Sequence, residues 1–194
     1  MAILQLNDNN LMIKAKKEIR KESKQAVMAL SAEQKNAQSH ALCEHLQALI
    51  AEHKPQVVAL FSPLPDEIDI SPLATGLECR VVMPRVGDGA DGEPDMEFFD
   101  YNPQAMASGA YGIAEPQAGE PCRVEDIDLM VVPGVAFSAD GVRLGRGKGY
   151  YDRYLSRDGF RAYCVGVCYA CQLRDDIPAE SHDKRVNLVI AGTE

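Results

Sequence analysis

Three glycines alternate with basic residues in the run Arg143-Leu144-Gly145-Arg146-Gly147-Lys148-Gly149-Tyr150-Tyr151. Glycine allows tight backbone turns and a close approach to a ligand, and cationic side chains suit phosphate oxygens. The run therefore predicts an anion-binding loop. A solvated Gly/Arg turn is the alternative, and the dense packing of Arg, Lys, Tyr and Asp disfavours it.

Two well-known phosphate loops do not fit this spacing. A Walker A loop needs a glycine five residues before Gly147 and a Ser or Thr after Lys148, but the chain has Val142 and Gly149 there. The dinucleotide fingerprint also fails, because its third glycine would fall at position 150, which is Tyr.

The elements on either side of the loop would aim it at a ligand. Residues 129–132 are an apolar run with β-branched residues, stopped by Pro133-Gly134, which predicts a buried strand. Residues 150–157 contain good helix formers, so we expect a helix whose free N–H groups face the ligand. Strand, glycine loop and helix together indicate phosphate binding.

Two further groups of charged residues could contribute to a site. Lys16 and Arg20 are four residues apart on a helical pattern that begins at Met12, so they share a face that could close over a polyphosphate. Three carboxylates at positions 66, 67 and 69 follow the predicted strand 57–61, where sites collect in open α/β sheets. The alternatives are a solvated helix face and an acidic cluster at a helix N-terminus.

A long motif adds a family resemblance to these patterns. It comprises Val132-Pro133-Gly134-Val135-Ala136-Phe137, then Asp140-Gly141, then residues 143–153. It closely resembles the signature of the 5-formyltetrahydrofolate cyclo-ligase family, and the similarity spans nearly the whole chain after the first dozen residues. The resemblance implies ATP-dependent closure of 5-formyltetrahydrofolate to 5,10-methenyltetrahydrofolate through a phosphorylated formyl oxygen, with release of ADP and phosphate.

The resemblance also implies roles for individual residues. Glu67 would hold the folate ring system, and Tyr111, in a segment similar to the family's Tyr-Gly-Ile-x-Glu-Pro, would line the folate pocket or pack on the core. Asp152 and Asp183 would hold Mg²⁺ with the nucleotide phosphates, although the family often has a second Asp where this chain has Asn187. The expected catalytic residues are Arg146 and Lys148; the expected ATP contacts are Lys16, Arg20, Arg143, Leu144, Gly145, Arg146, Gly147, Lys148, Gly149, Tyr150 and Tyr151; the expected substrate contacts are Phe61, Ser62, Glu67, Tyr111 and Tyr150.

The composition is that of an ordinary globular protein. Of the 194 residues 46% are hydrophobic and 25% charged, and the formal net charge of -9 argues against nucleic acid or an anionic membrane as the main partner. We expect a cytoplasmic monomer or small homo-oligomer with reduced cysteines. Cys164, Cys168 and Cys171 have the spacing of some iron–sulfur sites, but they overlap a predicted strand at 163–169.

The overall pattern predicts one α/β domain over residues 12–194, preceded by a flexible leader at 1–11. We expect two N-terminal helices, the second opened by a Ser31/Gln34 capping box and ending near His53, and a mainly parallel sheet flanked by helices. Further strands are predicted at 80–83, ended by Pro84, and at 96–99, with a loop at 87–94. A non-catalytic folate- or nucleotide-binding protein and a phosphosugar enzyme on a similar sheet are the alternatives.

Overall fold

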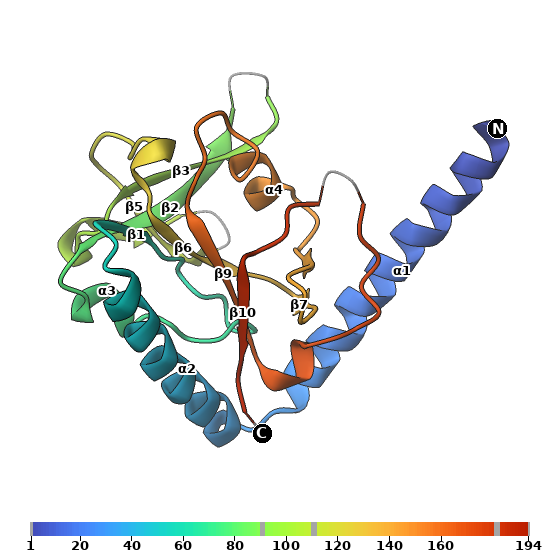
Figure 1. Ribbon diagram of the computed structural model, residues 1–194, viewed down its shortest axis with the longest axis horizontal. Coiled ribbons are helices and arrows are strands. Elements are labelled where there is room, and N and C mark those ends of the chain that lie inside the picture. Colours follow the sequence, from blue (N-terminus) through green and yellow to red (C-terminus); the bar gives the residue numbers. More distant parts are fainter. Residues whose placement is uncertain (1, 90–91, 110–111, 181–182, 194) are drawn as a thin grey trace.

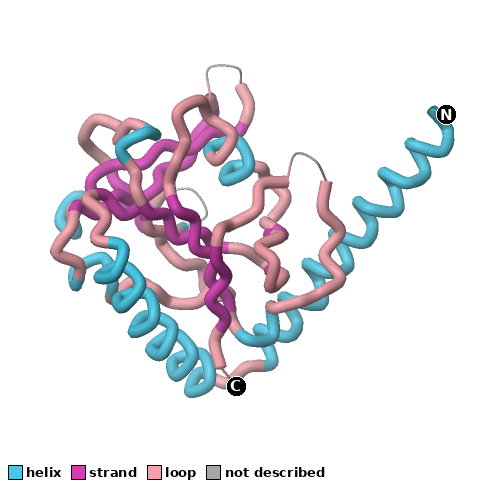
Figure 2. The backbone as a smooth tube through the Cα atoms, in the orientation of Figure 1, coloured by secondary structure: helices cyan, strands magenta, loops and turns pink. Residues whose placement is uncertain are grey.

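A six-stranded sheet forms the centre of the computed structural model, which describes residues 2–89, 92–109, 112–180 and 183–193 (Figures 1 and 2). The strand order is β10-β9-β6-β1-β2-β3, and neighbouring strands are parallel except for the antiparallel pair β2–β3. The predicted single domain with a mainly parallel sheet is confirmed. The strands are β1 (Val57–Ala59), β2 (Arg80–Asp88), β3 (Pro94–Asp100), β6 (Leu129–Pro133), β9 (Tyr163–Cys168) and β10 (Leu188–Ala191).

Both faces of the sheet are covered, so the central strands are apolar throughout rather than alternating. In β6, Leu129 and Val131 pack into one hydrophobic cluster, whereas Met130 and Val132 pack into a second one on the opposite face. Helix α2 (Ala32–His53) contributes Leu42 and other apolar residues to the first cluster. The two clusters make up the core that holds the strand ends in place.

The two N-terminal helices form as expected, with one correction. Helix α2 begins after Ser31, whose side chain accepts the Gln34 N–H while the Gln34 side chain accepts the Ser31 N–H, so the predicted capping box is confirmed. Helix α1 runs from Ala2 to Ala29 instead of starting at Met12. Residues 2–11 are therefore helical, because the weak turn preference of their Asn/Asp cluster does not outweigh propagation of a helix that has already formed. Figure 1 shows the first turns of α1 projecting away from the sheet.

Two other predicted boundaries differ in the structure. Strand β2 continues through Pro84 to Asp88, because β1 ends at Ala59 opposite Val82 and Pro84 pairs with Phe98 of β3, beyond the end of β1. The predicted loop at 87–94 is correspondingly shorter, since β3 already begins at Pro94. Helix α4 covers Tyr150–Tyr154 and not the expected 150–157. A helix of five residues has little macrodipole to offer a ligand.

Short elements complete the domain. Two small antiparallel sheets pair β4 (Met106–Ser108) with β5 (Ala114–Pro116), and β7 (Ala136–Phe137) with β8 (Arg143–Leu144). Helix α3 covers Leu73–Gly76, and 3-10 turns cover Pro103–Ala105, Val124–Asp126 and Ala170–Gln172. Among the described residues, no helix combines the length and apolar composition needed to cross a bilayer.

Candidate active site

A cavity lies at the carboxyl ends of β1 and β6, where the sheet connections diverge. From β1 the sheet continues to β2 and β3 on one side, and from β6 it continues to β9 and β10 on the other. Open α/β sheets bind ligands at such a switch point. The cavity is lined by Phe61 and Ser62 just after β1, and by Pro133 and Gly134 at the end of β6.

The structure brings the predicted site residues together around this cavity. Tyr111 lies outside the described residues, although its neighbour Ile113 lines the cavity. The roles of the individual site residues stay predictions. The predicted residues that line the cavity are Lys16, Arg20, Phe61, Ser62, Glu67, Arg143, Leu144, Gly145, Arg146, Gly147, Lys148, Gly149, Tyr150, Tyr151, Asp152 and Asp183.

Two glycines in the left-handed backbone conformation and one side chain from α1 determine the path of the glycine loop. Gly147 and Gly149 have φ angles of 89° and 77°, a region that glycine enters without strain. The Arg20 Nε donates to the Gly145 carbonyl at 2.8 Å, so α1 fixes the loop from above. Lys148 is exposed on the cavity lining, between these two turns.

Arg143 lies beneath the loop and not at its surface. Its side chain is only 4% exposed, and its Nη2 donates to the Asp152 Oδ1 at 2.7 Å. Within the described part of the chain, its Nε has no hydrogen-bond partner. A buried guanidinium needs a carboxylate nearby, so this ion pair orients Asp152 towards the cavity.

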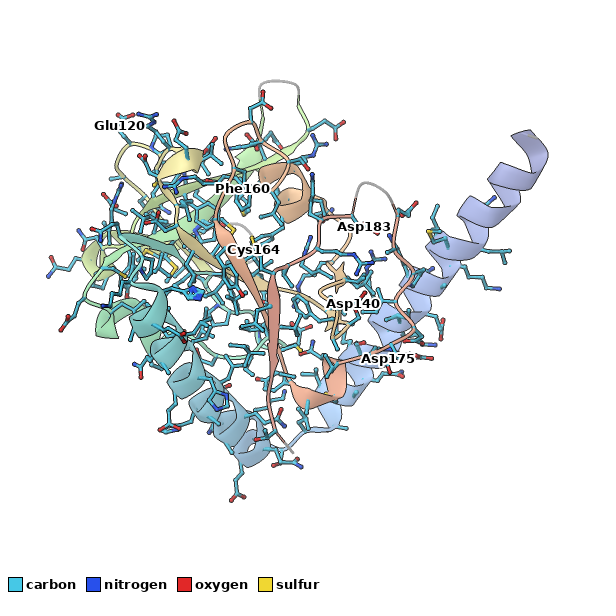
Figure 3. All side chains as sticks on the ribbon, in the orientation of Figure 1. Glu120, Asp140, Phe160, Cys164, Asp175 and Asp183 are labelled. Atoms are coloured by element: carbon cyan, nitrogen blue, oxygen red, sulfur yellow. The ribbon has the colours of Figure 1, made fainter. Side chains whose placement is uncertain are left out.

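A second ion pair joins α1 to the segment before β10. The Lys16 Nζ donates to the Asp183 Oδ2 at 2.6 Å and to the Glu180 Oε2 at 2.7 Å. Burial alone would lower the pKa of Lys16, but the hydrogen bonds to Asp183 and Glu180 outweigh it and the pKa is raised. Figure 3 shows Asp183 on the segment between the sheet and α1. Lys16 and Asp183 both line the cavity, so this ion pair lies at its edge.

A third group of charges lies in the loop after β1. Arg146 reaches across from the glycine loop and pairs with Asp66 through both terminal nitrogens, at 2.6 and 3.2 Å, and its Nε donates to the Glu67 Oε1 at 3.0 Å. The Glu67 Oε2 accepts the Leu64 N–H at 3.0 Å. Burial raises the pKa of Glu67, with the Leu64 N–H and Arg146 opposing it. Burial would also raise the pKa of Asp66, but Arg146 outweighs it and the pKa is lowered.

Sequence reasoning missed the apolar wall of the cavity. Pro84 and Val86 share one face of β2, and Met96 lies opposite Val86 on β3. Leu64 and Ile113 add to the wall. Pro84 and Val86 are two positions apart, which on a strand puts them on one face. The sequence prediction ended the strand at Pro84, so this shared face was not recognised. Such a wall suits a flat aromatic ring.

Two carboxylates of the kind that Mg²⁺ prefers, Asp152 and Asp183, line the same cavity. In the described parts of the chain, no group of three or more His, Cys, Asp or Glu residues could hold a metal by itself. Asp152 and Asp183 supply two carboxylates, and Mg²⁺ commonly completes its shell with phosphate and water oxygens. Asn187 serves the sheet instead, because its Oδ1 accepts the Cys164 N–H at 2.8 Å.

Two of the three cysteines at 164, 168 and 171 are buried in the sheet. Cys164 and Cys168 are buried on β9, and burial raises the pKa of each thiol to about 12. Figure 3 shows Cys164 within the sheet. Neither thiol therefore offers the accessible thiolate that a metal cluster requires.

Comparisons with known proteins find relatives along most of the chain. The model of the 5-formyltetrahydrofolate cyclo-ligase family matches residues 12–192. A mouse 5-formyltetrahydrofolate cyclo-ligase is 29% identical over 191 residues, which cover 91% of this chain and 93% of the mouse protein. A protein of the same name from Escherichia coli K12 is 31% identical over 140 residues, which cover 69% and 76% of the two chains.

Two solved structures are also similar. The 5,10-methenyltetrahydrofolate synthetase of Aquifex aeolicus superposes with a TM-score of 0.78 at 34% identity, over 91% of this chain and 89% of its own. A 5,10-methenyltetrahydrofolate synthetase from Mycoplasma pneumoniae superposes with a TM-score of 0.71 at 27% identity, over 90% and 97%.

Proposed function

Since the chain belongs to the 5-formyltetrahydrofolate cyclo-ligase family, we propose that it closes 5-formyltetrahydrofolate to 5,10-methenyltetrahydrofolate at the cost of one ATP. One observation carries the proposal: a cationic glycine loop and a buried carboxylate, Glu67, line the same cavity beside an apolar wall. This arrangement offers one region for phosphates and another for a flat ring with N–H donors.

The reaction needs ATP because an amide-like formyl group is a poor electrophile. Transfer of the γ-phosphoryl group to the formyl oxygen forms a P–O bond and releases ADP. The neighbouring folate nitrogen then attacks the formyl carbon and gives up its proton, and the C–O bond breaks as phosphate leaves. No protein nucleophile is required, so positioning and charge stabilisation account for catalysis.

Different residues of this chain would carry out the positioning and the charge stabilisation. Lys148 and the loop N–H groups would stabilise charge on the transferred phosphoryl group, with Arg146 at the boundary between the two substrates. Asp152 and Asp183 would hold Mg²⁺, which supplies charge neutralisation on the phosphates when bound. Glu67 would accept two N–H groups of the pterin ring. Lys16 and Arg20 would close the nucleotide side from α1.

Ultraviolet absorbance tests the proposal directly. The purified protein is mixed with 5-formyltetrahydrofolate and MgATP, and formation of the conjugated methenyl product is followed beside a control without ATP. An ATP-dependent rise is expected. A flat trace from folded protein that still binds folate would contradict the enzyme and favour a non-catalytic binding protein. The cytoplasmic location and the assembly as a monomer or small homo-oligomer stay predictions from composition.

A further inference from the structure

Arg146 bridges two carboxylates that belong to adjacent residues. Its two terminal nitrogens form a fork on Asp66, with Nη2 to Oδ1 at 2.6 Å and Nη1 to Oδ2 at 3.2 Å. Its Nε donates to the Glu67 Oε1 at 3.0 Å, and its Nη2 lies 3.0 Å from that same oxygen, so the second Glu67 oxygen takes no part in this pair. A forked arginine–carboxylate pair fixes direction as well as distance, so Asp66 is the stronger of the two anchors.

The partner of Glu67 must change when a ring with paired N–H donors binds. One Glu67 oxygen accepts the Leu64 N–H and the other accepts Arg146, and the side chain is only 9% exposed. Two Arg146 nitrogens occupy both lone pairs of Oε1, whereas Oε2 accepts only the Leu64 N–H, so a ligand that takes both oxygens in a forked pair must displace Arg146 from Oε1. Arg146 would then depend on Asp66 alone to remain in the cavity.

We propose that Asp66 is a positioning residue, which holds Arg146 between the nucleotide and folate regions while Glu67 exchanges Arg146 for the substrate. Asp66 lies outside the set of residues that line the cavity, so it acts through Arg146 and not on the substrate. The inference rests on the proposed function in one respect: it assumes that the ligand of Glu67 is the folate ring.

The local chain explains why Asp66 can stay in place. The Glu67 N–H donates to the Leu64 carbonyl at 2.9 Å, which closes a turn with Pro65 at its second position. The Tyr169 hydroxyl donates to the Glu67 carbonyl at 3.0 Å and ties this turn to the segment after β9. The Asp66 side chain is 24% exposed and remains on a fixed backbone when Glu67 changes partner.

A double-mutant cycle tests the proposal through turnover. Asp66→Asn should lower kcat about tenfold, which is the effect expected from the loss of roughly one charge-assisted hydrogen bond. The KM for folate should stay within about twofold of the wild-type value. In an Arg146→Met background the same change should have no further effect on kcat. Asp66→Glu, which keeps the charge, should recover most of the loss. Equal losses from Asp66→Asn in both backgrounds, or an unchanged kcat in the wild-type background, would overturn the proposal.

Asp176→Asn is the matched control. Asp176 also forms a fork, with Arg174 at 2.8 and 2.7 Å, and both residues lie outside the cavity. Its replacement should leave kcat and KM unchanged. A loss like that of Asp66→Asn would show a general charge effect and would overturn the positioning role.

A second readout does not depend on turnover. In a nitrogen-15 spectrum of arginine side chains, the Arg146 Nη–H signals, assigned by their loss in Arg146→Met, should exchange slowly with water in wild type and faster in Asp66→Asn, because both terminal nitrogens donate to Asp66. Unchanged exchange would overturn the proposal. If wild type binds folate without turnover, the proposed function fails, and this measurement still decides whether Asp66 holds Arg146.

Discussion

Replacing Glu67 with Gln should weaken folate binding without making the fold less stable. Burial raises the pKa of Glu67 above its ordinary value, although the Leu64 N–H and Arg146 oppose the shift. Between the ordinary and the raised pKa, the folded protein keeps a proton that the unfolded chain releases. The free energy of unfolding therefore falls as the pH rises through that window, and at neutral pH the charged carboxylate destabilises the fold. A neutral Gln removes this destabilising charge.

The size of the binding loss follows from the geometry of the carboxylate. A forked pair places two charge-assisted hydrogen bonds on Glu67, each worth about 1.5–3 kcal/mol. The amide of Gln keeps one acceptor oxygen and turns an N–H group towards the second donor. We expect a loss of about 2–4 kcal/mol, which corresponds to a roughly 30- to 1,000-fold weaker complex.

Two measurements on the same variants check this prediction. Titration calorimetry with 5-formyltetrahydrofolate gives the binding loss, and urea unfolding between pH 4 and 8 gives the stability. Glu97→Gln is the control, because Glu97 also pairs with an arginine, Arg157 at 2.8 Å, but lies outside the cavity. The control should bind folate like wild type. Unchanged binding in Glu67→Gln, or a variant clearly less stable than wild type at pH 7, would refute the reasoning.

Three further substitutions test other parts of the account. If the Lys148 charge acts on the transferred phosphoryl group, as proposed, Lys148→Met should lower kcat about 100-fold with little change in the folate Kd. Equal losses in both would count against that role. Asp152→Asn weakens the ion pair of buried Arg143, so it should lower the free energy of unfolding in urea by about 2 kcal/mol. It should also raise the Mg²⁺ concentration needed for turnover. An unchanged Mg²⁺ requirement would argue against Asp152 as a ligand. Gly141→Ala should cost about 2–4 kcal/mol in urea, since Gly141 has a φ of 90° and an added Cβ would lie 2.3 Å from the Val186 carbonyl oxygen; wild-type stability would show that this turn can relax.

Local signals in the sequence predicted most of the framework. Apolar runs marked β1, β6 and β9, and the Ser31/Gln34 pattern marked the start of α2. The failures occurred where neighbours in space decide the outcome. Pro84 is tolerated inside β2 because β1 has already ended, and the start of α1 at Ala2 depends on propagation from the rest of that helix. Neither fact is visible in a short window of sequence.

The site shows the same division. Spacing and motif resemblance identified residues from α1, the loop after β1, the glycine loop and the segment before β10, and the structure gathers them in one cavity. The sequence could not show that Arg143 lies buried beneath the loop, because burial depends on the packing of Tyr151 and Asp152 around it. The pair between Arg146 and Asp66 joins residues 80 positions apart, so it too required the fold.

The most direct test of the central claim is the fate of the formyl oxygen. The substrate is prepared with oxygen-18 in the formyl group and is turned over with unlabelled MgATP, and the released phosphate is analysed by mass spectrometry. If ATP activates that oxygen, each phosphate should carry one oxygen-18 atom. Unlabelled phosphate, with the label recovered in water, would contradict phosphoryl transfer to the formyl group.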